Sequence, residues 1–257
     1  MTNRTGNTTR ATAALLAAVS LLLGGCVVRP KEQASPGELL ILGQEDLKAE
    51  RFESARQAFQ RLLREYPDSK HRRDALLNLA DSYYKAEEYI EARVQYSEYV
   101  QLYPVSPQTA KAYYFLGMSD FNRILAYDQD QATTRDALKS FEELTKRFPR
   151  STYAPQAKEK IEVLRELVAK HELFIARFYM AKGKHVSAIP RFLEVVKNYR
   201  DQPEVRAEAM YHLAESYRLE ESYKKAGQAY RNLITDYPAS RFSQEAYRRL
   251  LDLSGQK

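Results

Sequence analysis

One spacing of residues recurs five times along the chain and constrains its fold more than any other feature. Each copy is anchored by an alanine, with an aromatic residue four positions later and a large residue seven positions later. The anchors are Ala55, Ala92, Ala137, Ala188 and Ala226. The residues four positions later are Phe59, Tyr96, Phe141, Phe192 and Tyr230. The residues seven positions later are Leu62, Tyr99, Leu144, Val195 and Leu233.

These offsets place the three residues of each copy on one stripe of an α-helix, where the alanine lets a neighbouring helix approach closely. An aromatic residue and then proline follow four of the anchors, and proline ends a helix because its ring cannot continue the hydrogen-bond ladder. The sequence therefore predicts an all-α fold, a superhelical array of five tetratricopeptide (TPR)-like helix–turn–helix repeats whose first helices line a concave groove. Serines two residues after each proline predict N-caps of the next helices. They are Ser69, Ser106, Ser151 and Ser240.

The repeats are unevenly spaced, with successive anchors 37, 45, 51 and 38 residues apart. In repeat three, Gly117 is the small residue of the first helix but lies eight positions earlier than the register requires. The polar segment 127–131 predicts a long loop between the two helices of that repeat.

Repeat four differs from the others in three ways. Residues 154–181 predict one extended helix with Pro155 in its first turn. Pro190 is compatible with the second helix if it lies in the first turn, and Arg200 replaces the proline that ends that helix. We assign residues 37–153 to repeats 1–3 and residues 154–257 to repeats 4 and 5; two subdomains joined by the long helix are one arrangement that fits.

Residues 1–25 predict a secretory signal peptide that is cleaved. Arg4 and Arg10 precede the stretch 11–23, which is apolar except for one threonine and one serine. A basic start followed by a short apolar stretch is typical of secretory signals and is too short for a membrane-spanning helix.

The apolar stretch ends in Leu-Gly-Gly followed by Cys26, the only cysteine of the chain. This ending resembles the lipobox of bacterial lipoprotein signal peptides. The resemblance implies a diacylglycerol on the thiol of Cys26 and an acyl chain on its new amino group, so that residues 26–36 become a membrane tether. Val27 stands where many inner-membrane lipoproteins have aspartate. The resemblance thus implies the outer membrane of a Gram-negative bacterium, facing the periplasm. An ordinary signal peptide with an incidental cysteine is the alternative.

Several segments of the chain, including part of the predicted long helix, together resemble one family of lipoproteins. The lipobox, the motif Tyr66-Pro67-Asp68-Ser69, the loop 128–131 and the run from His171 to Phe192 together resemble the BamD family (YfiO/ComL-type lipoproteins) of the outer-membrane β-barrel assembly machinery. The resemblance covers residues 12 to about 253. It implies that the chain binds the periplasmic domains of a BamA-type β-barrel subunit and associates with other lipoproteins of the machinery. It also implies that the chain helps the machinery to receive and insert unfolded outer-membrane proteins. It also associates the N-terminal repeats with substrate targeting segments and the C-terminal repeats with the BamA contact.

The repeat register itself predicts which side chains face the groove. In repeats two and three these positions form a candidate substrate-peptide groove: Leu77, Asp81, Tyr84, Tyr114, Met118 and Phe121. The alternative is that they belong to the core between helices. In repeats four and five, Arg and Tyr are favoured interface anchors. The candidate partner interface there consists of Arg177, Met180, Arg191, Tyr211, Glu215 and Arg218. The alternative for these is a solvated helix face.

Patterns typical of catalytic or metal sites are missing from the sequence. The four histidines form no i, i+4 pair, and one cysteine cannot form an intrachain disulfide or a cysteine-based zinc site. We therefore expect no enzymatic activity, no metal and no cofactor apart from the lipid on Cys26. The net charge of +6 is distributed over alternating acids and bases, which is typical of solvated helix faces and disfavours nucleic-acid binding.

Two other functions fit a lipid-anchored TPR array. One is a periplasmic adaptor that coordinates envelope constriction with peptidoglycan synthesis; such adaptors usually have an N-terminal coiled coil, for which residues 27–36 are too short. The other is an enzyme that acts on peptidoglycan and uses the array as a targeting arm, which would need a further domain beyond the five repeats.

Overall fold

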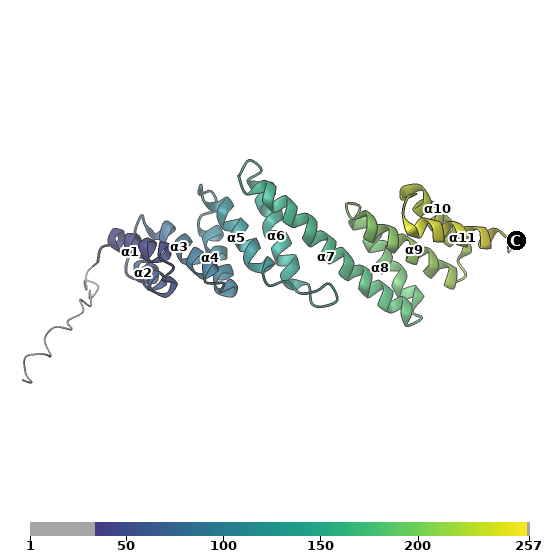
Figure 1. Cartoon of the computed structure of the whole chain (residues 1–257), viewed down its shortest axis with the longest axis horizontal. Coiled ribbons are helices and arrows are strands. Elements are labelled where there is room, and N and C mark those ends of the chain that lie inside the picture. Colours follow the sequence, from purple (N-terminus) through teal and green to yellow (C-terminus); the bar gives the residue numbers. More distant parts are fainter. Residues whose placement is uncertain (1–33, 256–257) are drawn as a thin grey trace, which may run out of the picture.

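The computed structural model describes residues 34–255, and every regular element in this part of the chain is an α-helix. Successive helices follow one another along the long axis of the molecule, from α1 at one end to α11 at the other (Figure 1). The helices are α1 (Pro36–Lys48), α2 (Phe52–Glu65), α3 (Arg72–Lys85), α4 (Tyr89–Leu102), α5 (Thr109–Phe121), α6 (Ala132–Arg147), α7 (Ala154–Ala181), α8 (His185–Asn198), α9 (Pro203–Leu219), α10 (Tyr223–Asp236) and α11 (Arg241–Gly255).

The membrane-related predictions fall largely outside this description. Cys26, the predicted signal peptide and the tether up to residue 33 lie outside the described residues. Among the helices of residues 34–255, none is long and apolar enough to cross a membrane.

The five predicted repeats are the helix pairs α1–α2, α3–α4, α5–α6, α7–α8 and α9–α10, so the TPR-like prediction is confirmed. All five anchor alanines and all residues four and seven positions later are completely buried. Burial of one large apolar side chain contributes about 1.5–3 kcal/mol, so the recurring stripe supplies the core of each pair.

Every second helix ends in the same backbone conformation. The residue after the helix is aromatic and has φ between −119° and −136° and ψ between 50° and 61°. These residues are Tyr66, Tyr103, Phe148, Tyr199 and Tyr237. The aromatic–proline signal thus places four of these helix ends correctly, and α8 ends in the same conformation at Tyr199 without a following proline.

The predicted serine N-caps require a correction. Each serine hydroxyl accepts a hydrogen bond from the backbone N–H two residues later, at 3.2–3.3 Å, and each serine carbonyl accepts one from the N–H three residues later. The serines are Ser69, Ser106, Ser151 and Ser240. A serine side chain that bonds two residues ahead opens a turn. Ser69, Ser106 and Ser151 therefore form the turn that leads into the next helix, which begins three residues later. Ser240 directly precedes α11, and its hydroxyl accepts from the second helical residue, so the N-cap prediction holds there.

The extended helix of repeat four is confirmed as α7, with a proline in its first turn. The prediction for Pro190 is wrong, because Pro190 is the sixth residue of α8 and lies in its second turn. Proline has no N–H to donate to the carbonyl of Val186 four residues earlier. Val186 lies at the exposed surface, where water can bond that carbonyl. The two-subdomain arrangement stays a prediction; α7 contacts α6 on one side and α8 and α9 on the other.

A clamp from α7 fixes the turn in which Arg200 replaces proline. Arg165 donates to both carboxylate oxygens of Asp201 at 2.5 and 2.7 Å and to the carbonyl oxygen of Asn198 at 2.9 Å. The Arg165 guanidinium also lies 5.5 Å from the centre of the Tyr199 ring. Hydrogen bonds to the turn thus replace the conformational restriction that proline provides elsewhere.

This clamp predicts a dependence of stability on pH. The hydrogen bonds from Arg165 lower the pKa of Asp201 from 3.8 to about 2. A carboxylate with a lowered folded-state pKa stabilises the protein above its unfolded pKa, and this contribution is lost as the pH falls from about 4 to about 2. Because Asp201 is half exposed, we expect at most about 1 kcal/mol. Urea denaturation should show Asp201→Asn less stable than wild type at pH 7, with the difference shrinking below pH 4. A difference that stays constant with pH would contradict the role of the clamp.

In repeat three, a close approach of two helices explains the shifted glycine. A Cβ atom on Gly117 of α5 would lie 2.8 Å from the ring of Phe141 on α6. Gly117 therefore serves as the small residue of this repeat although it lies early in the sequence. The surplus residues form the connection between α5 and α6, residues 122–131, so the predicted long loop is confirmed.

The contact at Gly117 predicts opposite outcomes for two glycine-to-alanine substitutions. Gly117→Ala should destabilise the protein by about 1–3 kcal/mol, because the aromatic ring must move to admit the methyl group. Gly227 inside α10 has its nearest neighbours at 3.5 and 3.7 Å, so Gly227→Ala should stabilise the protein by about 0.5–1 kcal/mol through helix propensity. Urea midpoints of both variants check this. Stabilisation by both substitutions would mean that the helices do not approach so closely at Gly117.

One helix, expected after Ser240, lies outside the five helix pairs. Helix α11 packs on α10 and α9 and buries Ser243 and Ala246. It takes the place that the first helix of a sixth repeat would occupy and covers the end of the array.

Candidate functional site

The N-terminal repeats enclose a polar cavity between their first helices. It has a volume of about 430 Å³ and lies between α1, α3 and the start of α5. Leu77, one of the predicted groove residues, lies on its wall and is itself mostly buried. The other lining residues are Gln44, Arg73, Asp74, Asn78, Ser106, Pro107, Gln108 and Lys111.

A hydrogen-bonded network holds Asp81 beside this cavity. The hydroxyl of Tyr96 on α4 donates to one carboxylate oxygen of Asp81 at 2.6 Å, and Nζ of Lys111 on α5 donates to the other at 2.5 Å. Burial, with Asp81 close by, raises the pKa of Tyr96 well above its ordinary value, so the phenol stays protonated as a donor. The predicted groove residue Asp81 is thus first of all a link between three helices, and it fixes the position of the Lys111 amine.

The remaining predicted groove residues are half-buried and pack against the core. The ring of Tyr84 lies 4.9 Å from that of Phe115, and the ring of Tyr114 lies 5.8 Å from that of Phe141. Met118 and Phe121 pack against the core of α5, α6 and α7. Each of these four half-buried residues has one side against the core and another open to solvent, so the groove prediction and its core alternative each describe part of their surroundings.

A second cavity, of about 530 Å³, lies between α7 and α8 and includes one predicted interface residue. The guanidinium of Arg191 lies 5.3 Å from the centre of the Tyr179 ring on α7. Arg191 is exposed, and the acids Glu172 of α7 and Glu194 of α8 line the same cavity. Met180, another predicted interface residue, is half-buried and packs against the core of repeat four.

On α7 a neighbouring surface contains aromatic residues that sequence reasoning missed. Phe174 and Phe178 are 41% and 53% exposed, and Tyr127 of the α5–α6 loop packs edge-on against Phe174 at 6.0 Å. The predicted interface residue Arg177 lies beside them and bonds Glu208 of α9 at 2.9 Å. The spacing of four residues between the two phenylalanines is the signal that could have revealed this surface.

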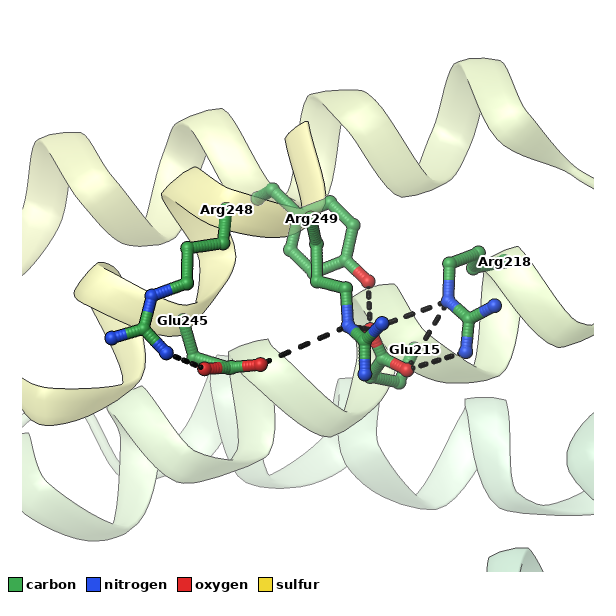
Figure 2. Close-up of polar contacts among 6 residues, drawn as sticks. Glu215, Arg218, Glu245, Arg248 and Arg249 are labelled. Carbon is green, nitrogen blue, oxygen red and sulfur yellow. Dashed lines mark hydrogen bonds and ion pairs between the residues drawn. The ribbon is translucent and has the colours of Figure 1, made fainter. Parts of the chain in front are cut away.

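In repeat five, the chain itself occupies the predicted interface. Glu215 is only 6% exposed and accepts hydrogen bonds from Arg218 at 2.8 Å and from the hydroxyl of Tyr230 on α10. Arg249 of α11 lies 3.3 Å from the same carboxylate and 3.9 Å from Glu245, as Figure 2 shows. The prediction that Glu215 faces a partner is therefore wrong, because α11 and its arginine cover it.

The other two interface residues of repeat five share these surroundings. The ring of Tyr211 lies 5.7 Å from that of Phe242 on α11, and Arg218 is held by Glu215. Burial alone would raise the pKa of Glu215, but the hydrogen bonds from Arg218 and Tyr230 together with the arginine charges lower it. Glu215 is thus an ionised carboxylate that joins three helices.

Comparisons with known proteins show the family of the chain. The family model YfiO, described as an outer membrane lipoprotein, matches residues 32–226. The chain belongs to the YfiO family. Two of its relatives are named outer membrane protein assembly factor BamD. The protein from Caulobacter vibrioides is 30% identical over 249 residues, covering 93% of this chain and 80% of the relative. The protein from Rickettsia prowazekii is 30% identical over 236 residues, covering 91% and 94%.

The resemblance to the BamD family stated from the sequence is thereby confirmed, and the YfiO match ends in the first turn of α10. Solved structures that resemble the chain include a TPR repeats protein from Bacteroides fragilis, 12% identical with a TM-score of 0.49, covering 88% of this chain and 100% of that one. Another is the TPR2AB domain of yeast Sti1, 15% identical with a TM-score of 0.43, covering 85% and 82%.

Proposed function

We propose that the chain is a non-enzymatic scaffold lipoprotein of the machinery that assembles β-barrel proteins in the outer membrane. The observation that supports this most strongly is the alignment with BamD assembly factors along more than nine-tenths of the chain, which includes every repeat. A stack of helix pairs with cavities between them offers binding surfaces over its length, as expected for a scaffold. The family favours this role over the envelope-constriction adaptor.

In this proposal the lipid on Cys26 anchors the array to the periplasmic face of the outer membrane. One acyl chain anchors a protein only weakly, whereas the three expected on Cys26 anchor it stably. Cys26→Ala should therefore move the protein from the membrane fraction to the soluble fraction or leave it as an uncleaved precursor. Fractionation with immunoblotting measures this, and wild-type partitioning of the variant would exclude the anchor.

The contact with a BamA-type β-barrel subunit is proposed at the cavity between α7 and α8 and on the adjoining aromatic surface. An exposed arginine that lies over a tyrosine ring beside a cavity has the composition of an interface anchor. Arg177 and the exposed rings of Phe174 and Phe178 line a separate cavity on the α9 side of α7, and the ring of Phe178 lies 6.0 Å from that of Tyr179.

Unfolded outer-membrane proteins are proposed to bind in the groove of repeats one to three. The polar cavity beside Leu77 and the half-buried side chains of Tyr84, Tyr114, Met118 and Phe121 would provide the contacts. Polar groups beside aromatic surface suit an extended segment whose side chains alternate between apolar and polar.

Affinity purification of the tagged chain from detergent-solubilised membranes, followed by mass spectrometry, tests the proposal. We expect a large β-barrel subunit and other lipoproteins in the eluate. An eluate that instead contains cell-division or peptidoglycan-synthesis proteins, without a β-barrel subunit, would reject it.

A further inference from the structure

The two edges of repeats one to three carry opposite charges. Short connections make successive helices antiparallel, so the turns between repeats lie along one edge and the turns within repeats along the other. Figure 1 shows one turn of each kind, α6–α7 and α5–α6, at opposite ends of α6. The turns between repeats, with four helical residues on either side, contain eight cations and three acids; they are residues 62–75, 99–112 and 144–157. The turns within repeats contain ten acids and five cations; they are residues 45–55, 82–92 and 118–135.

We call the segments 62–75, 99–112 and 144–157 the basic edge, which has a formal charge of +5 against −5 on the opposite edge. Two of its three acids already have a cation, because Glu65 pairs with Arg61 at 2.9 Å and Asp74 pairs with Arg73 at 3.2 Å. Four of its exposed cations take part in none of the ion pairs found within residues 34–255; they are Lys70, Lys146, Arg147 and Arg150. Their charge is therefore available to an anion outside the chain.

A cavity of about 710 Å³ lies on the basic edge, between the α4–α5 and α6–α7 turns, and is lined by Arg147 and Arg150. Arg147 donates to the hydroxyl of Tyr113 at 2.6 Å and to the carbonyl of Pro104 at 3.0 Å, two neutral groups that fix its position and leave its charge. Val105 also lines the cavity and is 89% exposed, more than any other large hydrophobic residue in the described part of the chain. Arginines beside an exposed apolar side chain suit the boundary between lipid phosphates and acyl chains.

The segment that leads back to Cys26 joins the array at this same edge. The hydroxyl of Tyr66, in the α2–α3 turn, donates to the carbonyl of Ala34 at 3.0 Å. A Cβ atom on Gly37 at the start of α1 would lie 3.7 Å from Nε2 of His71 in that turn. Eight residue steps separate Ala34 from Cys26, which is at most about 29 Å at full extension. A lipid on Cys26 would therefore bring the basic edge near the membrane.

From these observations we infer that the basic edge of repeats one to three lies on the membrane surface and binds its anionic phospholipid headgroups. This inference rests on the lipid anchor of the proposed function and adds an orientation that the anchor alone does not set. Lysine and arginine are attracted to an anionic bilayer within about a Debye length, and the same headgroups repel the acidic edge. The corresponding edges of repeats four and five have formal charges of +1 and +3, so the contact is confined to the N-terminal half.

Quenching of a fluorophore by a nitroxide on lipid headgroups shows which edge lies at the membrane. The probe is placed on Asp68→Cys at the basic edge or on Asp128→Cys at the opposite edge, since both aspartates are exposed residues of turns. Cys26 is the only native cysteine, and its lipid leaves the introduced thiol as the one that reacts. The lipidated full chain is reconstituted in vesicles of phosphatidylcholine alone, or of phosphatidylcholine with about one-third phosphatidylglycerol, both containing the nitroxide lipid.

On vesicles with phosphatidylglycerol, we expect the probe on Asp68→Cys to be quenched at least about threefold more strongly than the probe on Asp128→Cys. The two probes should be quenched almost equally on phosphatidylcholine alone. They should also become similar in 1 M salt, where the Debye length falls to about 3 Å from about 8 Å at physiological ionic strength.

Charge reversal on the basic edge tests which residues make the contact. The variant Lys70→Glu, Lys146→Glu, Arg150→Glu should lose the difference between the probes; it keeps Arg147, whose hydrogen bonds support the fold. The control changes the charge by the same amount at three exposed lysines of repeats four and five and should keep the difference. Its substitutions are Lys182→Glu, Lys184→Glu and Lys224→Glu.

Equal quenching of the two probes on vesicles with phosphatidylglycerol would overturn the inference, and this arm needs no charge-reversed variant to fold. A difference that is as large on phosphatidylcholine alone, that survives in the basic-edge variant, or that is lost in the control would also overturn it. A chain that floats with neither kind of vesicle would contradict the lipid anchor, and the inference with it. A chain that floats but shows equal quenching would contradict the inference alone.

Discussion

Glu215→Ala is expected to lower the free energy of unfolding by about 3 kcal/mol. The substitution leaves the Tyr230 hydroxyl buried without its acceptor and removes the carboxylate that Arg218 and Arg249 share. Breaking a buried ion pair by removal of one partner costs about 3–5 kcal/mol, and the partial exposure of both arginines places this case at the lower end. Urea denaturation followed by far-UV circular dichroism measures the change.

The matched control is Glu245→Ala in α11. Glu245 is 39% exposed and pairs with Arg248, which is 71% exposed, so its loss should cost less than about 1 kcal/mol. Figure 2 shows both acids in one network joined by Arg249, so the comparison contrasts an enclosed acid with an exposed one that shares a partner. Equal effects of the two substitutions would show that α11 does not enclose Glu215 as described.

The second large effect is expected from Arg191→Glu. Under the proposed function, charge reversal at an exposed interface arginine replaces an attraction with a repulsion, and we expect at least about a tenfold loss of the β-barrel subunit in co-purification. The fold should be retained, because the Arg191 side chain is exposed and its one ring contact, with Tyr179, is at the surface.

Lys197→Glu is the control for Arg191→Glu. Lys197 is also an exposed cation on α8 but does not line the α7–α8 cavity. It should leave recovery of the subunit unchanged. Equal losses with both variants would indicate a general charge effect, and unchanged recovery with Arg191→Glu would place the interface elsewhere.

The fold could be predicted because its determinants are local. Alanine, an aromatic residue and proline at fixed offsets specify a helix pair wherever they recur, and α7 follows from the run of residues 154–181. The predicted position of Pro190 within its helix was wrong, because a proline in the second turn is tolerated where solvent can bond the carbonyl that loses its N–H partner. That depends on exposure, which the sequence does not show.

The candidate sites were harder to predict because they depend on contacts between repeats. Asp81 and Glu215 occupy the same register position, and both accept a hydrogen bond from the tyrosine four residues after the anchor. The three repeats with phenylalanine at that position have no acid at the matching site, where they have Gln44, Met118 and Arg177. This pairing is a sequence signal for structural acids. The burial of Glu215 also requires α11, which packs over it and lies outside the five-copy pattern.

Depletion of the chain followed by measurement of folded porins in the outer membrane tests the central claim most directly. Folded and unfolded porins separate by heat-modifiable mobility in gels. The account predicts that folded porin falls while unfolded porin accumulates or is degraded, and that the wild-type gene restores folding. Normal levels of folded porin in cells that no longer contain the chain would contradict a role in outer-membrane protein assembly.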